Sequence, residues 1–84
     1  MPPAIPPDLE TALRVLLKAL RQDKNITQKQ LADQLGRPQS FVAKYEAGNR
    51  QLGLTEWLEI LEKLGADPVP FLRALMAVQK RKGR

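Results

Sequence analysis

The side chains that most often perform catalysis or hold metals are missing from this sequence. It contains no histidine and no cysteine, so the commonest general base and the thiolate ligands of metal sites are absent. The carboxylates fall mostly on the expected outer faces of helices, where no base–nucleophile pair or ligand cluster is visible. The sequence also lacks a glycine-rich phosphate loop. We therefore expect no enzyme, no cofactor and no metal.

Lysine and arginine are abundant instead, and they are unevenly placed. Fourteen Lys+Arg against nine Asp+Glu give a net charge of +5, and four basic residues within 80–84 supply +4 of it. Residues 21–50 carry +3 and residues 51–79 carry −2. A basic centre with a basic tail suits a polyanion such as nucleic acid. The alternative is a solvated surface that happens to be basic.

The elements that position these charges all show helical periodicity. Residues 1–7 contain four prolines and predict an extended arm. Asp8 is expected to cap a first helix that ends near Gln22. Its apolar stripe consists of leucines spaced by three and four: Leu9, Leu13, Leu16, Leu17 and Leu20. No segment alternates with a period of two, so no strand is expected.

The clearest helix start lies in the segment "ITQKQL". Thr27 and Gln30 have the spacing of a capping box, and Ile26 before the cap can pack on Leu31 as a hydrophobic staple. Gly36 is expected to end this helix, because glycine adopts the left-handed conformation cheaply.

A third helix is expected to follow at once and to stop at Gly48. Pro38 suits its first position, where the missing amide hydrogen would be unpaired in any case. Its apolar side carries Phe41, Val42 and Tyr45.

A fourth helix fits "LTEWLEILEKLG" and closes at Gly65. Five apolar residues are its inward candidates: Leu54, Trp57, Leu58, Leu61 and Leu64. Three carboxylates are expected to point outward: Glu56, Glu59 and Glu62. Asp67-Pro68 then starts a fifth helix, which has four large apolar residues on one side: Phe71, Leu72, Leu75 and Met76.

The second and third helices have the spacing of a helix-turn-helix. Counted from Gln28, the fourth residue is apolar (Leu31), the fifth is small (Ala32) and the ninth is Gly36. Ala32 lets the two helices cross closely, and Gly36 permits the sharp turn. Apolar residues at the fifteenth and eighteenth positions, Val42 and Tyr45, would hold the second helix in place. That helix is short and exposed along one side, as insertion into the major groove requires.

With these residues in place, "TQKQLADQLGRPQSFVAKYEAGNR" resembles the Cro/C1-type (XRE) helix-turn-helix family of phage and bacterial regulators. The resemblance continues through "LTEWLEILEKLGADPVPFLRAL" and covers residues from about 9 to 76. It implies an all-α, compact five-helix lambda-repressor-like DNA-binding domain. The expected organisation is an arm at 1–7, a domain at 8–79 with its helix-turn-helix unit at 27–48, and a basic tail at 80–84.

The resemblance also implies roles for individual residues. Gln39, Ser40 and Lys44 occupy base-reading positions. Their chemistry fits, since glutamine pairs with adenine, lysine suits guanine and serine can serve either base edge. Other matching positions would contact the DNA backbone or brace the reading helix: Gln28, Lys29, Phe41, Asn49 and Arg50. Phe41 and Ala43 could also touch a thymine methyl group. The alternative for Gln39 and Ser40 is that of plain solvated residues in a first helical turn.

Two further matches concern structure. Arg21 and Glu46 fall where family members often form a semi-buried ion pair, so Glu46 is not expected to touch DNA. Pro38 and Gly53 depart from the family pattern, because they stand where capping side chains are common before the third and fourth helices. Trp57 is expected in the core rather than in a stacking site.

One short reading helix covers few base pairs, so specific binding usually needs two, about 34 Å apart. We therefore expect a homodimer through the fifth helix, formed by Phe71, Leu72, Leu75 and Met76. The implied function is a sequence-specific double-stranded DNA-binding transcriptional regulator, a repressor that binds a palindromic operator.

Two alternatives remain open at the level of sequence. One is an antitoxin-like module that masks a protein partner through its acidic face and autoregulates its operon. The other is an architectural DNA binder without sequence preference. No apolar run could span a membrane, and "MPPAIPPDLE" does not have the pattern of a signal peptide. A cytoplasmic, nucleoid-associated location in a bacterial or phage context is therefore expected.

Overall fold

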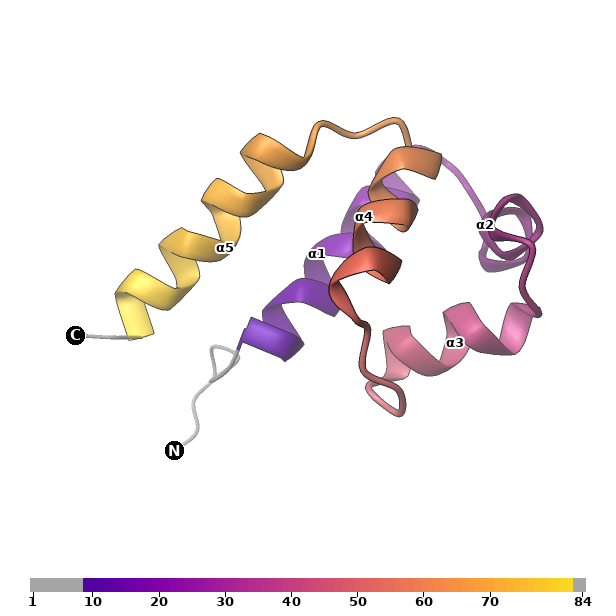
Figure 1. Ribbon diagram of the computed structural model, residues 1–84, viewed down its shortest axis with the longest axis horizontal. Helices are drawn as coiled ribbons and strands as arrows, with labels where there is room; N and C mark the ends of the chain where they lie inside the picture. The colour runs from indigo at the N-terminus through magenta and orange to yellow at the C-terminus, as the bar shows by residue number, and fades with distance from the viewer. Residues whose placement is uncertain (1–8, 83–84) are drawn as a thin grey trace.

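Helices form at all five segments where the sequence predicts them (Figure 1). The computed structural model describes residues 9–82, with side chains as far as residue 77. The helices are α1 (Leu9–Asp23), α2 (Gln28–Leu35), α3 (Gln39–Ala47), α4 (Leu54–Lys63) and α5 (Pro68–Lys82). No strand occurs in the described part of the chain, so the predicted all-α fold is confirmed. The expected arm, the Asp8 cap and the side chains of the basic tail lie outside the described parts.

The helices α1 to α4 end in the same way, with a left-handed residue just after the last turn. At the end of α2, Gly36 has φ 69°, and the following amide of Arg37 donates to the Ala32 carbonyl at 3.0 Å. α1 uses Asn25 at φ 58°, the residue type that best tolerates this conformation after glycine. This motif satisfies carbonyl groups at each helix end and lets the chain leave the helix axis at once.

The predicted capping box begins α2. The amide of Gln30 donates to the Thr27 hydroxyl at 3.0 Å, and the amide of Thr27 donates to the Gln30 side-chain oxygen at 2.9 Å. α5 begins as predicted at Asp67-Pro68, where the Asp67 carboxylate accepts from the amide of Val69 at 2.9 Å. The starts of these two helices could be predicted from the sequence because each depends only on residues three or fewer positions apart.

The start of α3 differs from the prediction by one residue. Pro38 is the N-cap rather than the first helical residue, because its ψ of 152° is extended and lies outside the helix. Its carbonyl accepts from the amide of Phe41 at 2.9 Å, and it has no side chain that could cap the helix. Gln39 is therefore the first residue of α3.

The start of α4 keeps half of a capping box. Gly53 has no side chain to accept from the helix, but its amide donates to Glu56 Oε1 at 2.9 Å. This bond recovers one of the two contacts that a hydroxyl cap and Glu56 would make together.

The buried core is contributed by all five helices and by Leu52. α4 turns a different face inward from the one expected. Leu54 and Leu58 are exposed, whereas Ile60 is completely buried beside Leu61. The core stripe of α4 therefore runs through residues 57, 60, 61 and 64, with Trp57 half-buried at its edge.

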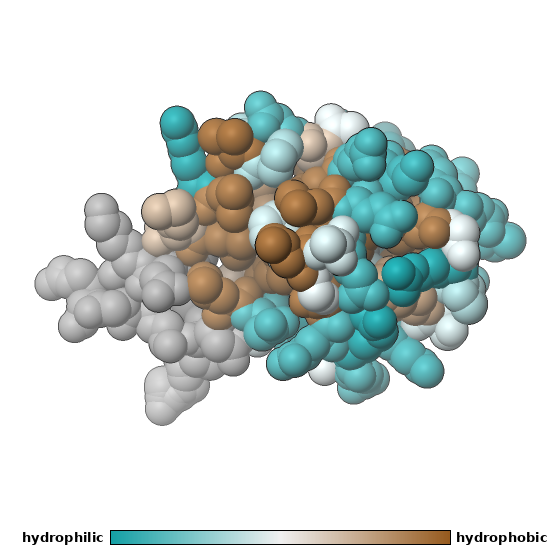
Figure 2. All heavy atoms as spheres, viewed as in Figure 1, coloured by the Kyte–Doolittle hydropathy of each residue, from teal (hydrophilic) through white to brown (hydrophobic). Residues whose placement is uncertain are grey.

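The molecule has an apolar side and a hydrophilic side, with α1 and α4 between them. In Figure 1, α1 and α4 occupy the middle, α5 lies on one side, and α2 and α3 lie on the other. Figure 2 shows apolar side chains gathered on the α5 side, while the surface toward α2 and α3 is mostly hydrophilic. No helix within residues 9–82 is long and apolar enough to cross a membrane.

Candidate nucleic-acid interface

Helix α3 is divided lengthwise into a buried face and an exposed face. Val42 and Tyr45 are completely buried. Gln39, Ser40 and Lys44, the three predicted base-reading residues, are all exposed. The structure thus brings these three side chains together on one accessible face of a nine-residue helix.

A buried ion pair holds α3 from behind. Arg21 Nε donates to Glu46 Oε2 at 2.7 Å and Arg21 Nη2 donates to Glu46 Oε1 at 3.0 Å, so the pair is bidentate. Arg21 Nη1 also donates to the Ile26 carbonyl at 2.7 Å. The hydrogen bonds to Glu46 raise the pKa of Arg21 above its usual value despite its burial. The end of α1, the loop before α2 and the end of α3 are joined by this one guanidinium.

Gln28 completes this network from the first position of α2. Its side-chain amide donates to Glu46 Oε1 at 3.0 Å. This bond links α2 to α3, and Gln28 itself is half-buried at the surface. Glu46 accepts three hydrogen bonds within the protein and is buried, so it does not face the solvent beside α3.

Tyr45 carries a polar group that the fold does not use. Its hydroxyl is buried, and no hydrogen-bond partner for it occurs among the described residues. Burial, with Glu46 nearby, raises the pKa of Tyr45 far above its usual value, so the phenol stays neutral. The hydrogen-bond network behind α3 therefore does not include this hydroxyl.

Phe41 lies at the edge between the two faces of α3. Its ring packs against that of Tyr45 in an edge-on arrangement, with the ring centroids 5.5 Å apart. The guanidinium carbons of Arg37 and Arg50 lie 4.4 Å and 4.8 Å from its centroid. Only 8% of the residue is exposed, so Phe41 supports α3 and offers little surface to a thymine methyl group. Ala43 is half-buried.

The two arginines beside Phe41 share one carboxylate, that of Glu56. Arg50 binds it through two donors, Nη1 to Oε1 and Nη2 to Oε2, both at 2.9 Å. Arg37 Nη1 makes one longer bond to Oε2 at 3.2 Å. Arg50 above all, then the Gly53 amide, lower the pKa of Glu56 to about 2. Glu56 was expected to point freely outward, whereas it is tied to both arginines and to the start of its own helix.

Sequence reasoning missed Arg37 and the role of Glu56. Arg37 stands in the turn before Pro38, where a cation has no local partner to mark it. Glu56 does have a local signal, since it follows the Gly53 cap by three residues as in a capping box. The two remaining backbone candidates are exposed. Lys29 pairs with Asp33 at 3.5 Å along α2, and Asn49 lies just beyond α3.

The chain resembles known helix-turn-helix proteins in both sequence and structure. A family model described as "Helix-turn-helix" matches residues 17–71. An XRE-family like protein from Pseudomonas syringae pv. tomato str. DC3000 is 43% identical with a TM-score of 0.78, over 82% of this chain and 84% of that one. A point mutant of the restriction-modification controller protein C.Esp1396I is 25% identical with a TM-score of 0.75, over 82% and 87%. No curated protein matched. Since the family match spans more than half of this sequence, the chain belongs to the Cro/C1-type (XRE) helix-turn-helix family of DNA-binding transcriptional regulators.

Proposed function

We propose that the protein is a sequence-specific repressor that binds a palindromic operator as a homodimer, with α3 of each copy in the major groove. The observation that carries this proposal is the division of α3. Three hydrogen-bonding side chains are exposed on one face, while the opposite face is fixed by buried residues and by the bond network of Glu46. A helix that reads DNA must be held rigidly by the rest of the domain, because its side chains must meet base edges at fixed positions.

The exposed side chains match the donor and acceptor pattern of the major groove. Gln39 can donate to N7 and accept from N6 of adenine, and Lys44 can donate to O6 and N7 of guanine. Ser40 lies between them and can either donate or accept. With a rise of about 1.5 Å per residue, α3 is about 13 Å long and reaches only a few base pairs. The short reach favours two copies on one operator.

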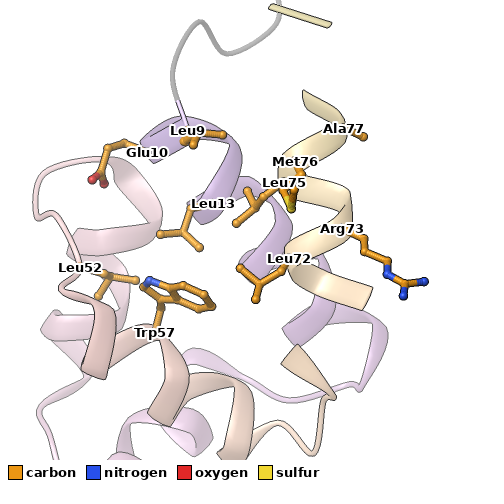
Figure 3. Close-up of a pocket in the computed structure, with 10 residues that line it drawn as sticks. All are labelled: Leu9, Glu10, Leu13, Leu52, Trp57, Leu72, Arg73, Leu75, Met76 and Ala77. Atoms are coloured by element: carbon orange, nitrogen blue, oxygen red, sulfur yellow. The ribbon is translucent and has the colours of Figure 1, made fainter. Parts of the chain in front are cut away.

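The surface proposed for pairing the copies is an apolar groove beside α5, of about 840 Å³. Figure 3 shows the Trp57 ring across its floor, with Leu13 and Leu52 on one side and Leu72 on the other. Leu72 and Met76 are 40% and 67% exposed and both line this groove, and a contiguous apolar surface of this kind often marks an interaction site. A second α5 of the same kind would bury both.

Fewer side chains of α5 are available for the proposed contact between copies than the sequence suggests. Leu75 is buried within the protomer, and Phe71 is half-buried with its ring centroid 5.8 Å from that of Trp57. Both side chains belong to the contact of α5 with its own domain, because α5 turns this side toward the core. Leu72 and Met76 remain as the candidates for contact between copies, and Val69 is exposed on the same helix.

The alternative of a partner-masking module depended on a free acidic face along α4. That face is smaller than the sequence suggests. Glu56 is tied to two arginines, and Glu59 is half-buried. Glu62 is exposed, so it is the one member of the expected face that extends openly into solvent. No observation favours this second function over DNA recognition.

The test is selection of bound duplexes from a random library, followed by gel-shift measurements with Gln39→Ala and Lys44→Ala. Each variant is expected to lose preference at particular base positions, because base-edge contacts specify sequence. The matched control is Lys63→Ala, which removes one exposed cation from the far end of α4 and should keep the wild-type preference. If both α3 variants select the same sequences as the wild type, α3 is not the reading helix.

A further inference from the structure

Arg37 is an accessible cation beside the reading helix to which no role has been assigned. It sits in the turn between α2 and α3, directly before the N-cap of α3. Its guanidinium lies 4.4 Å from the centroid of the Phe41 ring, in the first turn of α3. The side chain is still 35% exposed, so the ring and Glu56 orient it without enclosing it.

Arg37 and Arg50 differ in how fully the protein uses their hydrogen-bond donors. Arg50 makes two bonds of 2.9 Å to Glu56 and a third, at 3.0 Å, to the Gln51 carbonyl. Arg37 makes one bond of 3.2 Å to Glu56. A guanidinium has five N–H donors, and this is the one hydrogen bond that the Arg37 side chain makes to the described residues, so most of its donors remain for another acceptor. The two side chains are almost equally exposed, 35% for Arg37 and 39% for Arg50, so the difference lies in their donors, and Arg37 has more of them left for an acceptor outside the protein.

The cluster of Arg37, Arg50 and Glu56 is also not electrically neutral. Two guanidinium groups face one carboxylate, and Glu56 is ionised at neutral pH, as glutamate ordinarily is. The cluster therefore carries a net charge of +1 at neutral pH. One monoanionic phosphodiester would neutralise it, and the fork of Arg37 matches the two free oxygens of such a group.

The position of the cluster indicates which phosphodiester this would be. The N-terminal residues of a reading helix approach the base edges most closely, and the walls of the major groove are lines of phosphates. Arg37 precedes that end of α3 and lies against its first turn through Phe41. A cation there meets a groove wall when Gln39 and Ser40 meet bases.

We propose that Arg37 binds a DNA backbone phosphate at the N-terminal end of α3, positioned by the Phe41 ring and by the Glu56–Arg50 pair. The proposal rests on the proposed function, since it adds a contact to the same interface. It also gives Arg50 a different role from the one that the family resemblance implies. Arg50 is a positioning residue that holds Glu56, and Arg37 makes the phosphate contact.

The experiment measures dissociation constants by fluorescence anisotropy over a series of salt concentrations. The probes are a duplex selected by the wild-type chain and a mixed-sequence duplex of the same length. The charge-removing variants are Arg37→Gln and Arg37→Met, and the second keeps an apolar stem over Phe41 if the first fails to fold. Arg37→Lys keeps the charge, and Arg50→Gln tests the positioning role of Arg50. Lys63→Gln, which removes an exposed cation at the end of α4, is the matched control.

Loss of one phosphate contact in each copy should reduce the slope of log K against log salt by about 0.9 per bound copy, or about 1.8 for a dimer, in either charge-removing variant. Binding to both duplexes should weaken by the same factor, because a phosphate contact carries no sequence information. Arg37→Lys should retain the wild-type slope. Lys63→Gln should keep the wild-type slope. Arg50→Gln should lower the melting temperature and should reduce the slope by less than the loss of Arg37 does.

An unchanged slope in folded Arg37→Gln or Arg37→Met would overturn the proposal, as would a larger change in Arg50→Gln than in those variants. Loss of preference at single base positions in Arg37→Gln would also contradict it, since that result would indicate a base contact. If the wild-type chain binds neither duplex, the proposed function fails and this contact fails with it. Wild-type binding with an unchanged Arg37 slope removes only the phosphate contact.

Discussion

At the scale of single residues, the fold decides which polar groups are free to act. Glu46 lies in the proposed reading helix, yet it accepts three hydrogen bonds from Arg21 and Gln28 and is buried. A free carboxylate there would repel phosphates. Glu46 instead fixes the angle of α3, so the same helix can present Gln39, Ser40 and Lys44 without an adjacent negative charge.

The first prediction concerns this ion pair. Arg21→Met should lower the free energy of unfolding by about 3–5 kcal/mol, because it leaves a buried carboxylate without its cation. The double variant Arg21→Met/Glu46→Leu should recover part of that loss, since no charge is then buried. Urea unfolding followed by circular dichroism gives the values.

The matched control for the ion pair is Tyr45→Phe in the same core. Removing a buried hydroxyl without a partner should leave stability unchanged or raise it, because no hydrogen bond is lost. If Arg21→Met proved as mild as Tyr45→Phe, the pair would not anchor α3.

The second prediction concerns acid. Arg50 lowers the pKa of Glu56 from 4.5 to about 2, so the folded chain binds this proton less readily than the unfolded chain. The stabilisation from Glu56 is therefore present above about pH 4.5 and is lost as the pH falls toward 2. The difference in melting temperature between the wild type and Glu56→Gln should be constant above this window and should vanish below it. A difference in melting temperature that stayed the same from pH 6 to pH 2 would show that the ion pair contributes nothing to stability. The control is Glu62→Gln, at an exposed position.

Contacts within the protein could be predicted from the sequence only where a local pattern or the family resemblance marks them. The bidentate pair of Arg21 and Glu46 is present as the resemblance implied. Gln39, Ser40 and Lys44 are exposed on α3, and their base-reading role stays a prediction. The cluster of Arg37, Arg50 and Glu56 was not foreseen, because its members come from a turn, a loop and α4. Such a contact depends on how the chain folds back beside Phe41, and no spacing in the sequence encodes it.

At the scale of elements, the turn between α2 and α3 sets the geometry of the interface. Gly36 adopts φ 69° there, and nothing lies within 4 Å of where a Cβ would stand. Glycine is therefore favoured at this position only because of its left-handed backbone conformation, since an added Cβ would clash with nothing. The bond from the amide of Arg37 to the Ala32 carbonyl depends on this conformation.

The third prediction follows from that open space. Gly36→Ala should destabilise the chain by about 1–2 kcal/mol, which is the cost of a left-handed conformation for an ordinary residue. Gly36→Asn should cost less, because asparagine tolerates that conformation and already adopts it at Asn25. The melting temperatures of the two variants provide the comparison. An equal loss in both would mean that the turn itself rearranges.

Prediction of elements from the sequence was reliable for their number and weaker for their faces. Capping signals placed α2 and α5 correctly, because a cap is a local interaction. α4 offered two overlapping apolar stripes that share Trp57, Leu61 and Leu64. Packing against the other helices selected the stripe that contains Ile60 and left Leu54 and Leu58 exposed. That choice is made by tertiary contacts and cannot be read from periodicity alone.

At the scale of the whole molecule, the two proposed surfaces lie on opposite sides of α1 and α4 (Figure 1). The hydrophilic side holds α2 and α3, and the apolar side holds α5 and its groove (Figure 2). Separation of this kind lets one surface bind a second copy while the other stays open to DNA. The five-helix plan itself was predictable, because the family resemblance covers nearly all of the described chain.

The last prediction tests the α5 surface. Met76→Glu should convert the proposed dimer into a monomer in sedimentation equilibrium at tens of micromolar, because a charge would have to be buried in an apolar contact between copies. Val15→Glu places the same charge on an exposed apolar residue of α1 that does not line the groove, and it should remain dimeric. On a palindromic duplex, the monomeric variant should show about half of the wild-type salt slope, because each copy carries its own phosphate contacts. A wild-type chain that sediments as a monomer both with and without that duplex would overturn pairing through α5, and it would leave the exposure of Leu72 and Met76 to be explained by a different partner.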